Sequence, residues 1–329
     1  MLLTAPDGST VASTAVIAEG GMLGFITLHA ALDDGEYELR VQGLRTLDGR
    51  PVATLRSTFS VSSRAADPGA RATDWQGDAQ RAFSSPWRKL PHLKSRPGVT
   101  ALAGQVLLLD GEPLRHVTIE IGGQRVRTDQ TGRFLVELGT APSGWQEMVI
   151  DGATANRAGA RYGLFEVAVQ LVHGRTAPLP YTIWMPRLDT MNTVRIESPT
   201  TREVVITTPH IPGLELHLPR NTVITDRDGK VVREIGITPI PVDRPPFPLP
   251  TGVEVPVYFT IQPGGAYLSS HTYGPGRKGP WLVYPNYKQA APGARANFWH
   301  YDPEEKGWYV YGVGRVSADG DSFPQTFPI

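Results

Sequence analysis

The chain has 329 residues, in which 32 lysines and arginines balance 32 aspartates and glutamates. A net charge of zero provides no overall field for DNA, RNA or an anionic membrane, so nucleic acid is not an expected partner. Cysteine is absent, which excludes disulfides, thiolate metal sites, iron–sulfur clusters and cysteine nucleophiles. The 35 glycines and 30 prolines exceed average usage and favour an all-β fold of tandem sandwich modules with many turns and little helix.

The sequence shows no sign of membrane insertion. No apolar run approaches the roughly 18 residues that a membrane span needs. The first 20 residues contain Pro6, Asp7 and Glu19, where a signal peptide has a basic start and an apolar run. We therefore expect either a protein that stays inside the cell or a segment of a longer chain.

Residues 1–63 alternate apolar and polar side chains in short runs at 24–32, 37–44 and 55–61, separated by Asp-Gly turns. This is a hairpin pattern. The stretch LDDGEYELRVQGLRTLDGRPV, followed by STFSV, resembles the C-terminal half of a bacterial immunoglobulin-like domain. About four strands are present where such a sandwich usually has about seven, so we interpret 1–63 as a partial module of a larger protein.

Residues 64–98 lose this alternation and are rich in Ala, Arg, Asp, Gly, Ser and Pro. Such a composition is typical of a linker. A short helix over 74–83 is compatible with the sequence, and Trp75 and Trp87 are candidates for docking on a neighbouring domain.

Residues 99–171 form the first strong pattern of strands and tight turns. The order G-x-V, G-x-P-L, V-x-I-x-I-G-G and T-D-x-x-G-x-F resembles the carboxypeptidase-regulatory, or transthyretin-like, β-sandwich. That resemblance implies a non-catalytic domain. A Gly-Gly pair supplies the positive φ of a hairpin, and an Asp and a Gly bracket the turn that leads the next strand into the core. The structural turn residues are therefore Gly122, Gly123, Asp129 and Gly132.

Residues 172–329 contain further strand patterns, many prolines and most of the aromatic residues. The predicted strands are TVRIE, EVVIT, LELHL, REIGITPI, VPVYFTIQP, WLVYP, ARANFWHYD and GWYVYGVGRV. The stretch GLELHLPRNTVITDRDGKVVREIGITPIPVDRPPFPLPTGV resembles the β-domain that ankyrins and netrin receptors carry. We therefore expect 172–329 to be one β domain of this kind.

The series IPGLELHLP, VPVYFTIQPGGAYL and FWHYDPEEKGWYVYGVGRVSADG resembles the region upstream of the tyrosine–aspartate repeats in bacterial Rhs and YD-repeat proteins, which are teneurin-like. The resemblance covers residues 98–320. It implies modules that plug or support one end of a hollow repeat shell, in a protein that is exported or surface-associated. The chain contains neither a YD repeat nor an aspartyl self-cleavage core, so no toxin activity is implied.

The histidines show no metal-binding pattern. HExxH and His-x-His spacings are absent, although such spacings bring two imidazoles to one metal. His210 and His217 come closest, but residues seven apart on a strand point to opposite faces. We expect no metal ion and no other cofactor.

Serine and carboxylate patterns also favour a protein without catalytic activity. There is no G-x-S-x-G elbow, and Ser270-His271-Thr272 departs from the His-Phe-Ser triplet of self-cleaving domains. The acidic clusters at 226–229, 302–305 and 319–321 lack the full calcium loop with its distal glutamate. Asp side chains cap turns without an ion, so we interpret these clusters as turns.

Aromatic residues concentrate near the C-terminal end. Exposed, they would form a stacking platform for a sugar or a docking face for a protein; buried, they would be core or interdomain contacts. In the last two predicted strands the rings fall on both faces, so some must be exposed or covered by another domain. The candidate docking or ligand face comprises Trp281, Tyr284, Tyr287, Phe298, Trp299, Tyr301, Trp308, Tyr309 and Tyr311.

The run VDRPPFPLP at 242–250 favours polyproline II and cannot donate into a sheet. It is either a rigid crossover or a ligand for a proline-reading module. The features of the residues predict a non-catalytic protein, and the resemblance to Rhs and YD-repeat proteins implies a plug and packing segment whose main partner is the repeat shell of its own parent polypeptide. The alternative is an adhesion module that binds carbohydrate or protein through the late aromatics.

Overall fold

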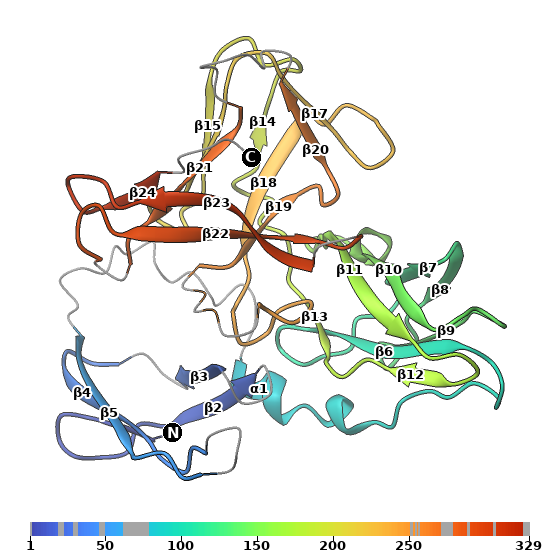
Figure 1. Cartoon of the computed structure of the whole chain (residues 1–329), viewed down its shortest axis with the longest axis horizontal. Coiled ribbons are helices and arrows are strands. Elements are labelled where there is room, and N and C mark those ends of the chain that lie inside the picture. Colours follow the sequence, from blue (N-terminus) through green and yellow to red (C-terminus); the bar gives the residue numbers. More distant parts are fainter. Residues whose placement is uncertain are drawn as a thin grey trace.

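The fold is all-β, as the sequence predicts (Figure 1). Within the described part of the chain, the only α-helix is α1 (Ala79–Ser84), and no helix is long and apolar enough to cross a membrane. The computed structural model describes residues 2–18, 23–28, 32–45, 50–61, 79–250, 253, 255, 257–270, 279–287, 290–304 and 307–324.

The N-terminal module contains a three-stranded antiparallel sheet, with the order β1-β4-β5, and a separate β2–β3 hairpin. Alternation in β4 buries Tyr37, whose ring stacks on Phe59 at 5.7 Å between centroids. Leu55 remains half exposed at the sheet edge. The strands are β1 (Leu2–Thr4), β2 (Ser13–Ala18), β3 (Leu23–Leu28), β4 (Gly35–Val41) and β5 (Leu55–Val61).

The middle of the chain folds into a β-sandwich. One sheet has the order β11-β10-β7-β8; in the other, β6 lies between antiparallel β9 and the short parallel strands β12 and β13. Because β12 and β13 pair with β6, the sandwich extends past residue 171, where the sequence analysis ended it. The strands are β6 (Ala101–Leu108), β7 (Thr118–Ile121), β8 (Gln124–Arg127), β9 (Arg133–Glu137), β10 (Gly144–Asp151), β11 (Leu164–Leu171), β12 (Thr176–Pro178) and β13 (Ile183–Met185).

Both faces of β6 are covered, so every residue of this strand is buried. One face meets the sandwich core, where Val106, Ile119, Phe134 and Ile150 pack together. Leu107 points to the opposite face of β6, where it packs with Ala82 of α1. A strand buried on both sides loses the apolar–polar alternation and becomes continuously apolar.

Residues 79–98, which the sequence analysis assigned to a linker, pack along the sandwich. Trp87, in the 3₁₀ turn η5 (Pro86–Lys89), lies against the buried cluster that contains Trp184. The Ser85 hydroxyl donates a hydrogen bond to the Gly111 carbonyl at 2.6 Å. Trp75 lies outside the described residues.

The turns of the sandwich have the backbone that their residue types allow. Gly122 and Gly123 between β7 and β8 have φ of +55° and +78°, and Gly132 has φ of +73°. Asp129 accepts hydrogen bonds from the backbone N–H groups of Thr131 and Arg133, at 2.8 and 3.0 Å. These contacts start β9 and place its apolar side chains inward.

The C-terminal module contains several small sheets, ordered β14-β18-β19, β15-β16-β21-β24, β17-β20 and β22-β23. Its core includes Ile206, Leu216, Ile224 and Ile237. All eight predicted strands are present, whereas β17, β20 and β24 were not predicted. The strands are β14 (Val194–Arg195), β15 (Val204–Thr207), β16 (Glu215–Leu218), β17 (Thr222–Thr225), β18 (Glu234–Pro239), β19 (Phe259–Gln262), β20 (Tyr267–Ser270), β21 (Trp281–Pro285), β22 (Arg295–Asp302), β23 (Gly307–Arg315) and β24 (Ser322–Pro324).

Candidate functional site

The β22–β23 hairpin brings part of the aromatic set to the sandwich. Its register places Trp299, Tyr301, Trp308 and Val310 on one face of the hairpin. The Tyr301 and Trp308 rings lie 4.7 and 5.9 Å from the Phe247 ring, centroid to centroid. Phe247 is part of the sandwich core, and Tyr301 and Trp308 pack against that core. The hairpin is therefore an interface between the two larger modules.

Two hydrogen bonds orient these rings. The Ala168 backbone N–H, on β11, donates to the Tyr301 hydroxyl oxygen at 3.0 Å. The Trp308 indole N–H donates to the Pro248 carbonyl at 2.8 Å. Burial raises the pKa of Tyr301 above its ordinary value.

The proline-rich run 242–250 lies between the modules. Arg244 is buried and donates from its guanidinium to the Leu109 carbonyl of the sandwich. Phe247 inserts into the sandwich core, while the Pro248 carbonyl meets Trp308. Inside this chain the run is thus a crossover that both modules contact.

Polar groups of the C-terminal module cover the edge of β11 that no other described strand of its sheet pairs with. The Gln262 side chain accepts from the Leu164 N–H and donates to the Leu164 carbonyl, both at 3.4 Å. Next along the strand, Glu166 forms an ion pair with Arg227 at 3.4 Å. An edge strand leaves backbone groups unpaired, so that another chain can pair with them. The Gln262 side chain satisfies two of these groups on β11.

Three other aromatics of the candidate set pack inside the C-terminal module. Phe298 is buried and lies 4.4 Å from Tyr284 and 6.3 Å from Tyr311, measured between ring centroids. The hydroxyl oxygens of Tyr284 and Tyr311 are 3.5 Å apart. Burial raises the pKa of Tyr284 to about 12 and raises that of Tyr311 as well. These rings contribute to the core.

The remaining candidates lie apart from one another. Trp281 stacks on His217 at 4.5 Å on the sheet that contains β16 and β21. Tyr287 is 52% exposed and donates its hydroxyl to the Pro212 carbonyl at 2.7 Å. Trp299 and Tyr309 are half-buried on the hairpin. The nine aromatics are therefore divided among a core, an interface and the surface.

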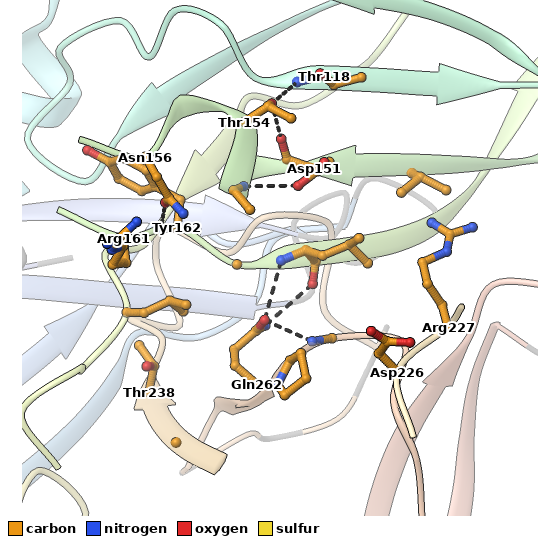
Figure 2. A pocket seen from close by; sticks show the side chains of 18 of the residues that line it. Thr118, Asp151, Thr154, Asn156, Arg161, Tyr162, Asp226, Arg227, Thr238 and Gln262 are labelled. Atoms are coloured by element: carbon orange, nitrogen blue, oxygen red, sulfur yellow. Dashed lines mark hydrogen bonds between the residues drawn. The ribbon is translucent and has the colours of Figure 1, made fainter. Parts of the chain in front are cut away.

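A groove of about 970 Å³ runs between the outer face of the sandwich and the C-terminal module (Figure 2). Its polar side chains mainly hold local backbone: Asp151 accepts from the Ala153 N–H at 3.0 Å, and Asn156 accepts from the Tyr162 N–H at 2.8 Å. Sequence reasoning missed this groove because its walls come from distant segments, and no local motif marks them.

No group of three or more His, Asp or Glu within the described ranges is placed to hold a metal ion. His217 lies between Glu203 and Glu215, at 2.9 and 2.7 Å, whereas His210 is 3.4 Å from Asp189. The two histidines do not share a site.

The acidic clusters form turns. In the first, Asp226 accepts hydrogen bonds from the N–H groups of Asp228 and Lys230, both at 2.9 Å. Asp302 accepts from the Glu304 N–H at 2.9 Å. Carboxylates that satisfy their own turns need no ion.

A scan against known protein families finds no match, and no curated protein matches the chain. The fold and the interface define a class instead: an all-β protein made of separate, mostly antiparallel sheets, in which an aromatic hairpin and a proline-rich crossover join two modules.

Proposed function

We propose that this chain is a non-catalytic structural segment, which holds β modules in a fixed arrangement and packs against the remainder of a larger exported or cell-surface protein of the Rhs and YD-repeat kind. The supporting observation is the joint apolar cluster, in which Tyr301 and Trp308 of the C-terminal module pack on the sandwich core around Phe247. The YD-repeat parent is proposed from the sequence resemblance alone.

The energetics of this cluster favour a rigid joint. A buried aromatic side chain removes about 150–250 Å² from water, at roughly 25 cal/mol per Å². Flexible domain pairs usually meet through smaller and more polar surfaces. Here the apolar contacts lie beside hydrogen bonds from Ala168 and Trp308. A hinge motion between the modules would therefore break the apolar contacts and the hydrogen bonds together.

Trp308→Ala tests the rigid joint. We expect a folded protein in which calorimetry resolves separate unfolding of the two modules and small-angle scattering shows a broader distribution of shapes. Trp145→Ala is the matched control, because Trp145 is 68% exposed on the sandwich. Unchanged unfolding and scattering in Trp308→Ala would contradict the proposal.

The parent protein is tested separately. Sequencing the gene beyond the Ile329 codon should show an array of tyrosine–aspartate repeats; a stop codon there would contradict this part of the proposal. If the array is present, Trp299→Ala should fold normally and lose association with the separately expressed repeat shell. Trp299 suits this test because it is half-buried beside the exposed Val310 on the hairpin face.

One observation favours carbohydrate binding as a second candidate function. Trp145 presents 68% of its surface on the face of β10 that also displays Gln170 across the strand pair. A flat apolar ring beside a polar side chain suits stacking on a sugar. A glycan array should then show binding that Trp145→Ala abolishes, and an array without signal would remove this candidate.

A further inference from the structure

Glu166 lies in the middle of the module interface. Its side chain points from β11 toward the C-terminal module, is 19% exposed and lies 3.4 Å from the Arg227 guanidinium. The turn after β19 presses on this carboxyl group, since a Cβ added to Gly265 would lie 2.9 Å from the Glu166 Oε1 atom. Water therefore has little access to one side of the carboxyl group.

The charges that face Glu166 are mostly of its own sign. Glu147 and Asp151 are its diagonal neighbours on β10, because the register pairs Glu166 with Val149. Glu304 approaches from the β22–β23 turn, and Arg227 from the turn after β17. Burial first, and then Glu147 and Glu304, raise the pKa of Glu166, and Arg227 only partly offsets them.

We infer that Glu166 is an acid-responsive latch, at which uptake of one proton tightens the contact between the sandwich and the C-terminal module. The inference deepens the proposed structural role and rests on the interface described there. A neutral carboxyl group gives up its ion pair with Arg227, but it also loses its repulsion from Glu147 and Glu304 and no longer needs hydration beside Gly265, and these gains are the larger.

The direction of the effect follows from proton linkage. The folded interface binds the proton more readily than the unfolded chain does, because the pKa of Glu166 is raised on folding. Stability from this group therefore increases as the pH falls through the folded-state pKa, and levels off below the unfolded-state pKa of about 4.3.

Glu166→Gln tests the latch, because glutamine resembles the protonated side chain at every pH. In thermal unfolding at pH 7.5 we expect the variant to melt about 2 °C or more above the unmodified protein. This difference should shrink as the pH is lowered through the raised folded-state pKa toward the ordinary glutamate value of about 4.3. A variant that melts lower at pH 7.5, or a difference that does not change with pH, would overturn the inference.

Glu120→Gln is the matched control. Glu120 lies on the same face of the same sheet, because both Glu120 and Glu166 pair with Val149. Its cation, Arg125, lies 2.8 Å away and belongs to the sandwich itself. We expect its melting difference to show no such pH dependence. An equal effect in Glu120→Gln would also overturn the inference, because the response would then belong to the sheet and not to the interface.

Arg227→Gln removes the positive partner of Glu166 and leaves the carboxyl group in place. Without this cation the Glu166 carboxyl group should take up its proton at a higher pH, which NMR of ¹³C-labelled glutamate side chains measures directly. A Glu166 signal that titrates in the ordinary range in both proteins would disprove the latch. The Trp308→Ala result on the rigid joint would stand independently, so the two proposals fail separately.

Discussion

Two glycines of the sandwich have similar backbone angles and different surroundings. Gly123 has φ of +78° and open space where a Cβ would lie, whereas Gly132 has φ of +73° and would place a Cβ 2.3 Å from the Val106 carbonyl oxygen. Gly123→Ala should cost about 1 kcal/mol of unfolding free energy from backbone strain. Gly132→Ala should cost clearly more, because backbone must also move. Urea unfolding of both variants checks this order, and equal costs would contradict it.

Asp129 should make part of the stability depend on pH. Burial tends to raise the pKa of Asp129, but hydrogen bonds from Thr131 and Arg133 outweigh it and lower the pKa. The contribution is therefore present above the usual aspartate pKa and is lost as the pH falls from about 4 toward the folded value. It should stay below about 1 kcal/mol, since the side chain is 42% exposed.

Asp129→Asn provides the measurement, because asparagine keeps an acceptor oxygen but cannot titrate. In urea unfolding between pH 5 and pH 2.5, the unmodified protein should lose more stability than the variant does. Parallel curves for the two proteins would show that Asp129 does not contribute.

At the scale of elements, the buried Ser85 hydroxyl between α1 and η5 adds a hydrogen bond to the apolar contacts that hold both elements to the sandwich. Ser85→Ala removes the hydrogen bond to the Gly111 carbonyl and leaves that acceptor unsatisfied, which should cost about 1–2 kcal/mol. We expect faster hydrogen exchange in residues 79–90 and nearly unchanged exchange in β6. Ser95→Ala is the control, since the Ser95 hydroxyl donates to Glu137 at an exposed site; equal effects would contradict the assignment.

Most elements were predictable because their signals are local. Alternation around an Asp-Gly turn indicated the pairing of β4 with β5, and Gly122-Gly123 indicated the β7–β8 hairpin; the structure contains both. The missed strands β17 and β20 are four residues each and pair across 42 to 48 positions, from Thr225 to Tyr267 at one end and from Thr222 to Ser270 at the other. Short runs of this kind have no nearby partner whose pattern would identify them.

At the scale of the whole molecule, coupling of the two modules depends on a close backbone approach. A Cβ on Gly264 would lie 2.1 Å from the Leu164 carbonyl oxygen, so Gly264→Ala should separate the β11 edge from Gln262. We expect calorimetry to resolve two transitions. Gly293→Ala, where the same atom meets open space, should preserve a single one, and a single transition in both variants would refute this coupling.

The sequence by itself determined the all-β class, most strands and the tight turns, because side-chain alternation and glycine conformations act over a few residues. It also identified the aromatic residues, but only the tertiary structure decided which of them are core, interface or surface. The deciding contacts join Leu164 to Gln262, Ala168 to Tyr301 and Leu109 to Arg244, across 98, 133 and 135 positions. A local pattern shows that a face is apolar, whereas the surface that covers it depends on how distant segments pack.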